Sequence, residues 1–600
     1  MAGLRIANCS GFYGDRLSAA QEMVDGGPID VLTGDFLAEL TMLILAKNKM
    51  ADPRSGYAKS FLRQMEEVMG PCLERGIKVV SNAGGLAPAR LAEELDGLAS
   101  RLGLSPVIAY VSGDDLMERL EELSGPSGGF AHFETGEPLG SRQVLSANAY
   151  LGGFPIARAL EEGADIVVTG RVTDAALALG PAAWHHGWGA NDLDQLAGAV
   201  VAGHVIECGA QATGGNYAFF EEVPGAEHIG FPIAEVEADG SSVITKHEGQ
   251  GGLVSVGTVT AQLLYEIGSP AYANPDVVAR FDTIELTQLG PDRVGISGVR
   301  GEAPSGRLKV AMNYLGGYRT TLTMMLTGLD PAGKAALFER ALWASIPGGK
   351  QSFSQVEVEL VESGRSDPAD NALALSSLRI TVRDENPEKV GRAFAAKVTE
   401  LALASYPGLF GGGSQTQAYG VYWPSSLPTE LITPQVHIGP AVTPVAQPVP
   451  RAGEPVERSR ACLPPPPRGE LVEAPLGLLV GARSGDKGGD ANLGVWALSE
   501  EGYGFLAHFL TTDKLKELLP ETRPLEVRRY ELANIWALNF LVVGLLGEGV
   551  AASSRIDGQA KGLGEYLRAK VVPVPAQLLE RETGLLERET GRPEREKGTI

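Results

Sequence analysis

Cysteine is scarce in this chain of 600 residues, and its spacing excludes several kinds of site. The four cysteines are scattered and no two form a CxxC pair, so the sequence indicates neither a disulfide framework nor a cysteine-ligated zinc site. Long apolar runs are also missing, because the most apolar late window, 537–550, is too short to span a bilayer. No signal segment opens the chain, and we expect a cytoplasmic protein without a membrane partner.

Basic charge is in short supply as well. The 51 Lys and Arg residues face 74 Asp and Glu residues, which gives a net charge of −23. This balance disfavours nucleic acid and anionic membranes as partners. Any phosphate group of a ligand would need local cations or helix N-termini. What the chain has in quantity is glycine, with 77 residues, which is typical of α/β folds with many tight turns.

The first part of the chain alternates apolar runs with helical patterns. The apolar runs fall at 4–12, 30–47, 76–86, 106–115 and 164–177. Each ends in glycine or polar residues before the next amphipathic stretch. This rhythm predicts βαβ units, and therefore an α/β fold with a mainly parallel sheet and helices on both faces. Ligands of such sheets bind beyond the carboxyl ends of the strands.

Composition divides the chain into five expected segments. Proline runs mark a stiff linker, and the repeated "LLERETG" near the end predicts a charged, disordered tail without a chemical role. The expected segments are an α/β core over 1–225, a β-rich and βα portion over 226–440, the linker over 441–470, a small domain over 471–575 and the tail over 576–600.

Three loops that follow strands share an asparagine close to glycines. Their amides and backbone N–H groups would suit a carboxylate or a phosphate. The alternative is that each is a simple turn, since Asn and Gly tolerate left-handed backbone angles. None matches GxGxxG or a Walker loop, so no nucleotide cofactor is identified. The substrate-binding candidates here are Asn8, Gly11, Asn82, Gly84 and Gly85.

Two more strand-end loops, "TGDFLAE" and "TGRVTDAAL", bring charge to the same edge. Asp35 and Asp174 are candidates for substrate binding, or alternatively N-caps of the helices that follow them. Glu39 adds a further carboxylate. Arg171, just past a strand, has the guanidinium fork that fits a carboxylate or a phosphate.

The segment "GHVIECGAQATGGNY" concentrates potential catalytic groups. Cys208 would be a nucleophile, with His204 as its base and Glu207 beside it. If the segment is helical, His204 and Cys208 share a face. Gln211 and Asn216 are candidates for substrate binding. The alternative is a buried cysteine in a turn, next to a solvated glutamate.

The segment "RSGDKGGDAN" packs charges and glycines together at a density that is unusual for a surface loop. Its glycines would permit close approach of the backbone to a ligand. A salt-bridged turn is the alternative. The candidates in this region are Arg483 and Asn492 for binding, Asp486, Lys487 and Asp490 for acid/base or orienting roles, and Asn534 and Asn539 on the same face.

The remaining candidates concern a loop and a metal. Lys246 lies in the glycine-rich "TKHEGQGGLVS", which either closes over the site or forms a hairpin tip. His185 and His186 are adjacent, so they point in different directions, and no carboxylate stands at ligand spacing. No metal site is therefore predicted. A metal-dependent hydrolase would need at least two of His185, His186, His204 and His247 to converge on carboxylates.

Several of these motifs occur together in a known family. "NAGGLAP", "DIVVTGRVTDAAL", "GHVIECGAQATGGN" and "KHEGQGGLVSVGTVTAQLLYEI" resemble the acyclic terpene utilisation AtuA family, over about 4–445. "ARSGDKGGDANLGVWA" resembles the ferredoxin-fold domain at the end of its longer members, over about 474–574. The resemblance implies a ferredoxin-like α+β domain at the C-terminus and a branched or terpenoid acyl-CoA as substrate. It assigns no catalytic residue.

Residues and resemblance together predict an acid/base enzyme, of lyase or hydratase type, acting on a branched acyl-CoA. The reaction would be hydration, dehydration or carbon–carbon lysis, with coenzyme A present as part of the substrate and no separate cofactor. The alternatives are a metal-dependent hydrolase and a non-catalytic assembly subunit of an acyl-CoA carboxylase. The assembly alternative predicts that Cys208 and His204 point away from any pocket and that Asp486 and Lys487 pair only with each other. We expect a homo-oligomer.

Overall fold

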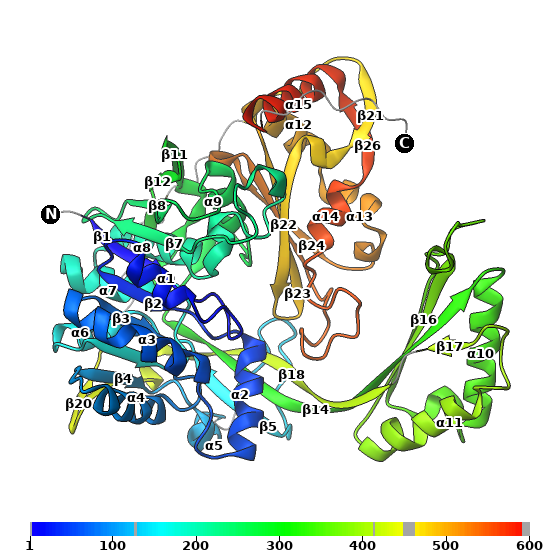
Figure 1. The fold of residues 1–600 in the computed structure, drawn as a ribbon, viewed down its shortest axis with the longest axis horizontal. Helices are drawn as coiled ribbons and strands as arrows, with labels where there is room; N and C mark the ends of the chain where they lie inside the picture. Colours follow the sequence, from blue (N-terminus) through cyan, green and yellow to red (C-terminus); the bar gives the residue numbers. More distant parts are fainter. Residues whose placement is uncertain (1–2, 125–128, 412–413, 448–455, 457–462, 591–600) are drawn as a thin grey trace.

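The structure is a computed structural model that describes residues 3–124, 129–411, 414–447, 456 and 463–590, with side chains as far as residue 584. The N-terminal body (Figure 1) contains a sheet with the strand order β11-β12-β8-β7-β1-β2-β3-β6-β4-β19-β20. Its five central strands are parallel: β1 (Leu4–Asn8), β2 (Val31–Gly34), β3 (Lys78–Ser81), β6 (Ile166–Thr169) and β4 (Ile108–Ser112). Antiparallel strands extend both edges: β7 (Pro232–Val236), β8 (Ser242–Lys246), β12 (Arg293–Ser297), β11 (Glu285–Gly290), β19 (Gln435–Ile438) and β20 (Ala441–Pro444).

Helices cover both faces of this sheet because both faces are apolar. Along β1, Ile6 packs into one apolar cluster and Ala7 into the other, as alternation along a strand requires. Helix α8 is buried from Leu196 to Ile206 and fills one of these layers. The helices of the body are α1 (Ala19–Asp25), α2 (Glu39–Ala51), α3 (Lys59–Arg75), α4 (Pro88–Leu102), α5 (Leu120–Ser124), α6 (Phe154–Glu161), α7 (Ala176–His186), α8 (Leu193–Ile206) and α9 (Val256–Leu263).

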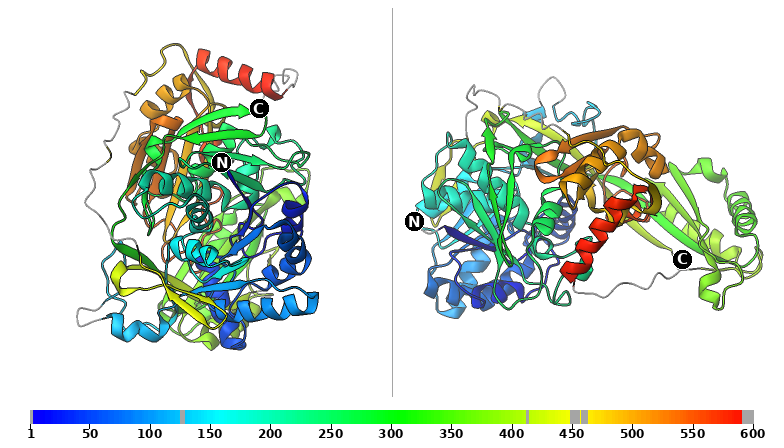
Figure 2. Two further views of the ribbon diagram at one scale, coloured as in Figure 1. Left: turned by 90° about the vertical axis from the view of Figure 1, so that its left-hand side faces the viewer. Right: turned by 90° about the horizontal axis from the view of Figure 1, so that it is seen from above.

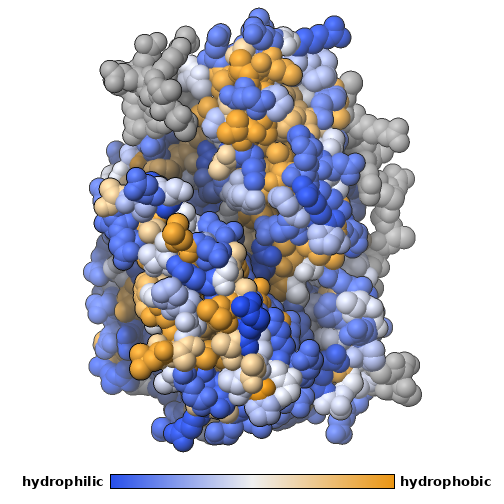
Figure 3. Space-filling view, turned by 90° about the vertical axis from the view of Figure 1, so that its right-hand side faces the viewer, coloured by the Kyte–Doolittle hydropathy of each residue, from blue (hydrophilic) through white to orange (hydrophobic). Residues whose placement is uncertain are grey.

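Two long antiparallel strands carry the chain out of the body into a lobe. β14 (Arg307–Thr327) pairs with β18 (Gln415–Pro428), and its first half also pairs with β5 (Val144–Ala149). The lobe has its own apolar core, which includes Phe338 and Ile380, and it projects from the rest of the molecule (Figures 1 and 2). Seen end-on in Figure 3, its side of the molecule is hydrophilic surface broken by apolar patches. Its other elements are α10 (Pro331–Ser345), β15 (Gln355–Val361), β16 (Leu375–Asp384), α11 (Phe394–Glu400) and β17 (Phe410–Gly411).

The C-terminal domain is a four-stranded antiparallel sheet covered by helices. Its strand order is β22-β23-β25-β24. A separate antiparallel pair consists of β21 and β26, the first and last strands of the domain. The elements are β21 (Leu471–Pro475), β22 (Val480–Lys487), β23 (Asp490–Ala497), α12 (Glu500–Phe509), α13 (Thr512–Leu518), β24 (Val527–Leu532), β25 (Ala537–Val542), α14 (Leu563–Arg568), β26 (Val571–Pro575) and α15 (Ala576–Thr590). A small sheet of β9 (Ala271–Ala273), β10 (Val278–Arg280) and β13 (Arg300–Glu302) lies in the body.

The fold class predicted from the sequence is confirmed, but three expected segments need revision. Residue 225 is no domain boundary, because β7 and β8 extend the sheet that begins with β1. The separate unit in the middle of the chain is the lobe. The tail does not begin at residue 576, because α15 starts there and buries Leu578 and Glu582. Residues 448–455 and 457–462 of the central linker and residues 591–600 lie outside the described residues. Among the described helices, none combines the length and apolarity needed to cross a membrane.

Candidate active site

A cavity of about 1520 Å³ lies where the body, the base of the lobe and the C-terminal domain meet. The body contributes the loops after β1, β2 and β6, the end of α8 and the segment 265–275. The lobe contributes residues near the start of β14 and the end of β18. The C-terminal domain contributes the turn between β22 and β23 and residues 543–551. Ligands of parallel sheets bind at this edge, beyond the strands' carboxyl ends.

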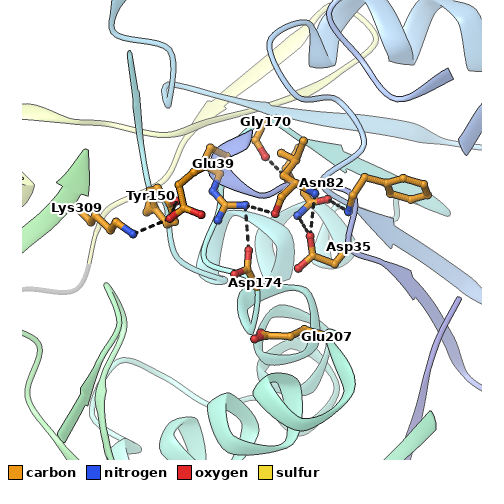
Figure 4. A network of polar contacts seen from close by, with 12 residues as sticks. Asp35, Glu39, Asn82, Tyr150, Gly170, Asp174, Glu207 and Lys309 are labelled. Atoms are coloured by element: carbon orange, nitrogen blue, oxygen red, sulfur yellow. Dashed lines mark hydrogen bonds and ion pairs between the residues drawn. The ribbon is translucent and has the colours of Figure 1, made fainter. Parts of the chain in front are cut away.

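Arg171 is the centre of a polar network, and its neighbours Tyr150 and Asp174 are labelled in Figure 4. Its backbone N–H donates to Asp114 Oδ2 (2.7 Å) and its Nη1 donates to Leu37 O (2.8 Å). The same Nη1 lies 3.0 Å from Asp174 Oδ1, and the guanidinium carbon lies 4.2 Å from the centre of the Tyr150 ring. Arg171 is therefore held on several sides and presents a fixed cation to the cavity.

Two buried asparagines position the groups that face the cavity. Asn82 Nδ2 donates to Asp35 Oδ1 (2.6 Å), and its Oδ1 accepts from the N–H of Phe36 (2.8 Å). Asn8 Nδ2 donates to the carbonyls of Ile206 (2.6 Å) and Glu207 (3.0 Å), at the end of α8. Asn8 and Asn82 thus order the cavity wall without facing the cavity.

An ion pair from the lobe closes one side of the network (Figure 4). Lys309 Nζ donates to Glu39 Oε1 (3.1 Å), and Tyr150 Oη donates to the same oxygen (3.3 Å). Burial alone would raise the pKa of Glu39, but the charges of Lys309 and Arg171 outweigh burial and lower it. Glu39 is therefore ionised at neutral pH.

The pKa values of the other carboxyl groups at this edge of the sheet are raised, whereas that of Glu39 is lowered. Burial raises the pKa of Asp35, Asp174 and Glu207, and each receives a further increase from a neighbouring carboxylate. Glu207 is separate from the bonded network in Figure 4, and its Oε2 has no hydrogen-bond partner among the described residues. Its Oε1 lies 3.1 Å from His204 Nδ1. Burial and Lys487 lower the pKa of His204 to about 4, so its imidazole is neutral at pH 7.

The turn between β22 and β23 brings Asp486, Lys487, Gly488 and Gly489 to the cavity. Lys487 Nζ donates to the carbonyl of Glu266 (2.6 Å), and burial and then Lys309 lower its pKa. Burial and Glu266 raise the pKa of Asp486 to about 6. A side chain at Gly489 would collide with a backbone oxygen, because a Cβ there would lie 2.3 Å from Gly547 O.

Arg483 reaches the cavity from the same strand, β22. Its Nη1 donates to Asn216 O (3.1 Å), its Nη2 donates to Gln211 Oε1, and its guanidinium lies over the Tyr265 ring. Among the described residues Arg483 has no carboxylate partner. Its positive charge is therefore available to an anionic group of a ligand.

Comparison with known families identifies both regions that surround the cavity. The family described as acyclic terpene utilisation family protein AtuA matches residues 4–438. The chain belongs to the AtuA family. The AtuA ferredoxin-like domain matches residues 474–573 and lines the same cavity. Searches of the curated proteins and of the solved structures gave no match. The family relates the chain to acyclic terpene utilisation, and the predicted membership and ferredoxin-like domain are confirmed.

The AtuA cavity gathers more than half of the residues singled out from the sequence. Those that line it are Gly11, Asp35, Glu39, Arg171, Asp174, Glu207, Cys208, Gln211, Asn216, Arg483, Asp486 and Lys487. Those that do not are Asn8, Asn82, Gly84, Gly85, His204, Lys246, Asp490, Asn492, Asn534 and Asn539. Several of the second group nevertheless hold members of the first group in place, as Asn82 holds Asp35.

The residues outside the cavity have identifiable structural contacts. Lys246 Nζ lies 3.0 Å from Asp292 Oδ2 and donates to Gln250 O, so its loop is tied to the neighbouring strands. A Cβ at Gly84 would lie 2.4 Å from Thr169 O, which explains a glycine there by packing. Asp490 Oδ1 accepts from the N–H of Gly544 (2.7 Å) and braces the hairpin.

Cys208 lines the AtuA cavity, but its surroundings disfavour a thiolate. Burial and the neighbouring Glu207 raise the pKa of the thiol well above its usual value. His204, the predicted base, engages Glu207 instead. The geometry gives Cys208 no activating base, so its predicted role as nucleophile loses its physical support.

His185 and His186 are neighbours with ring centres 4.8 Å apart, but three of the four histidines of the metal alternative make separate contacts. His186 Nε2 lies 3.0 Å from Val236 O, His247 Nε2 lies 2.9 Å from Met23 O, and His204 pairs with Glu207. Within the part of the chain that the structure describes, no three His, Cys, Asp or Glu residues are grouped to hold a metal ion. The convergence that a hydrolase of this kind needs is therefore not found there.

The alternative of a non-catalytic assembly subunit made two structural predictions about these residues. Asp486 lies 3.3 Å from Lys561, and Lys487 binds a backbone carbonyl, so they do not pair only with each other. Cys208 faces the cavity, whereas His204 lies behind it. These positions favour a site over a closed turn.

Several tyrosines, lysines and a glutamate that line the cavity are not singled out individually by any sequence pattern. Lys309 and Tyr422 lie on β14 and β18, whose apolar alternation is typical of any strand. Tyr150 lies within one of the three Asn-Gly loops, and Glu266 is the second-last residue of a family motif, so both belong to recognised patterns. Lys561 carries no local signal. These groups reach the cavity through tertiary packing, which no short motif encodes.

Proposed function

We propose that the chain is an enzyme of acyclic terpene and branched-chain acyl-CoA catabolism that performs acid/base chemistry on a branched acyl thioester. The observation that carries the proposal is a pair of groups with opposite protonation preferences in one cavity. Burial favours the protonated acid at Glu207 and the neutral amine at Lys487. Two titratable groups whose environments shift their pKa values in this way suit a general acid and a general base.

The proposed chemistry follows from these two forms. The Lys487 amine takes the proton from the carbon next to the thioester carbonyl, and Glu207 Oε2–H donates to the carbonyl oxygen as charge develops on it. The product of this step is an enol, a species common to hydration, dehydration and carbon–carbon lysis of acyl thioesters. Arg171 lies in the same cavity and would stabilise negative charge on the ligand.

The cavity has features that suit the rest of such a substrate. Arg483 supplies a cation without a carboxylate partner among the described residues, which fits a phosphate or carboxylate of the ligand. Large apolar side chains that line the cavity and remain exposed would accept an aliphatic chain. These are Phe12, Leu40, Phe133 and Phe220.

Thermal unfolding against a ligand panel tests this proposal. The panel contains free CoA and isovaleryl-, 3-methylcrotonyl-, geranyl- and 3-hydroxy-3-methylglutaryl-CoA. A ligand at about a hundred times its dissociation constant adds roughly 2.7 kcal/mol of stability, which gives a measurable shift. We expect a shift with at least one acyl-CoA, reduced in Lys487→Met but kept in Lys514→Met, a matched change at a lysine of the same domain that does not line the cavity. The absence of any shift with every thioester would contradict the proposal.

A further inference from the structure

Glu266 has an unusual backbone conformation for its residue type. Its φ is +56°, in the left-handed region that favours glycine. Glutamate there costs on the order of 1 kcal/mol or more, so the surrounding structure must hold it. Glu266 also lines the cavity. Strained residues that the surrounding structure holds in place are often found at functional sites.

The groups that hold this conformation come from the ferredoxin-like domain. The N–H of Glu266 donates to Asn492 Oδ1 (2.8 Å), and its carbonyl accepts from Lys487 Nζ (2.6 Å). The acceptor on Asn492 and the donor on Lys487 that fix the Glu266 backbone both lie at the turn end of the β22–β23 hairpin. Docking of this domain and the local backbone of the body are therefore coupled at Glu266.

A second asparagine supports this clamp. Asn539, on β25, accepts from Asn492 Nδ2 and donates to the carbonyls of Ile267 (3.2 Å) and Gly268 (2.6 Å). Asn492 and Asn539 are both completely buried. Buried amides whose hydrogen bonds are satisfied in this way fix one geometry, because breaking them leaves polar groups without partners.

The side chain of Glu266 affects the charge around Lys487. The negative charge of Glu266 favours the protonated form of Lys487, whereas Lys309 favours the neutral form. The other groups that act on Lys487 are Glu39 on α2, Asp174 before α7, and the Tyr272 ring, whose centre lies 5.6 Å from Nζ. His204 and Glu207, from α8 and its end, are also coupled to Lys487.

We propose that Glu266 is a positioning residue for Lys487. The ferredoxin-like domain clamps the backbone of Glu266, its carbonyl places the Lys487 amine, and its carboxylate sets the local charge. The inference rests on the proposed function in that Lys487 is the proposed base. It adds that the two domains build this base together, since the amine comes from one domain and its setting from the other.

Chemical labelling of Lys487 tests this proposal without any substrate. The full chain is treated with acetic anhydride between pH 6 and pH 10, and the modification rate of Lys487 is measured by mass spectrometry relative to exposed Lys59. Only the neutral amine reacts. Glu266→Gln keeps the backbone contacts but removes the negative charge, so Lys487 should label about tenfold faster below its pKa. Asn492→Ala should also change the Lys487 rate, because the clamp is lost.

The control is Glu565→Gln, which removes the same charge from a cavity-lining glutamate that pairs with Arg568 instead. This variant should leave the Lys487 rate unchanged. A merely structural role for Glu266 would alter the unfolding temperature of Glu266→Gln but leave the labelling profile within about twofold of the wild type, and that result would overturn the proposal. Since no thioester is used, failure of the ligand panel and failure of this inference are distinguishable.

Discussion

Glu207 and Glu39 line the same cavity, yet their surroundings shift their pKa values in opposite directions. Glu39 lies between Lys309 and Arg171 and stays ionised. Glu207 has His204 as its neighbour, and burial favours its protonated form. The difference shows that the partner of a buried carboxyl group, more than its burial, decides its charge.

A pair of matched substitutions checks this assignment. Glu207→Gln replaces a neutral acid by a neutral amide of the same shape, so the free energy of unfolding at pH 7 should change by less than about 1 kcal/mol. Glu39→Gln leaves Lys309 without its carboxylate partner and should cost about 3 kcal/mol. Urea unfolding of both variants measures the difference. Equal costs, or the reverse order, would show that the two charge states are assigned wrongly.

At the residue scale, the sequence identifies groups that directly follow a strand. Asp35, Arg171 and Asp174 were predictable because the carboxyl ends of parallel strands meet at one edge. Whether each residue faces the cavity or supports it was not predictable. Asn82 and Asp35 lie in similar loops, but one holds the other.

At the scale of elements, the β22–β23 hairpin brings Asp486 and Lys487 of the ferredoxin-like domain to the cavity. Its turn combines Gly488, at a φ of +65°, with Gly489, which packs against the backbone of Gly547. A Cβ at Gly488 would lie 3.2 Å from the Tyr422 ring of β18, so the glycine there lets the charged strand end approach the base of the lobe, whereas the contact of Gly489 lies within the ferredoxin-like domain. The density of glycine and charge that was visible in the sequence therefore reflects a domain contact as well as a site.

Gly489→Ala should disturb this hairpin. The added Cβ would lie 2.3 Å from a backbone oxygen, so the turn must shift. We expect a loss of about 1–3 kcal/mol in the free energy of unfolding, typical of overpacking, and a weaker ligand-induced shift because Lys487 moves. Gly290→Ala is the matched control, since a Cβ there meets nothing within 4 Å. Equal behaviour of the two variants in thermal unfolding with and without ligand would argue against a tightly packed tip.

The strands β14 and β18 show why part of the site escaped the sequence. They bring Lys309 and Tyr422 to the cavity through an antiparallel pairing of residues more than a hundred positions apart. Their local pattern is that of ordinary strands, so only the tertiary pairing places the two side chains. The sequence pattern also did not predict the lobe as a separate unit, because its strands and helices were included in the expected β-rich and βα portion over 226–440.

For the whole molecule, several buried carboxyl groups bind protons more tightly than they would in the unfolded chain. Burial raises the pKa of Asp114, Asp276 and Asp486 to about 6 and that of Asp490 to about 7, all from 3.8. Between pH 4 and pH 7 the folded state therefore holds more protons at these groups, and their contribution to stability increases as the pH falls through this range.

His204 acts in the opposite direction. Its pKa falls from 6.5 to about 4 on folding, so the stability associated with its neutral form is lost as the pH drops below 6.5. Four carboxyl groups against one imidazole predict a higher unfolding temperature at pH 6 than at pH 8.5. Scanning calorimetry across this range measures it. A steady rise in unfolding temperature with pH would mean that these carboxyl groups are ionised without cost.

The arrangement of domains was predictable only in part. The parallel sheet and the small C-terminal domain follow from local patterns, whereas the sharing of one sheet between segments on both sides of residue 225 does not. Antiparallel strands that extend a parallel sheet have the same local texture as a separate β domain. The cavity itself depends on how the two family regions dock, which is set by buried contacts such as Asn492 with Glu266.

The central claim is that Glu207 and Lys487 act together as acid and base on an acyl thioester. Its most direct test is proton NMR of isovaleryl- or 3-hydroxy-3-methylglutaryl-CoA in D₂O, which follows the exchange of the protons next to the thioester. We predict exchange catalysed by the wild-type protein and slowed at least about 100-fold in both Glu207→Gln and Lys487→Met. Exchange that proceeds equally in both variants, or no exchange with either thioester, would contradict the claim.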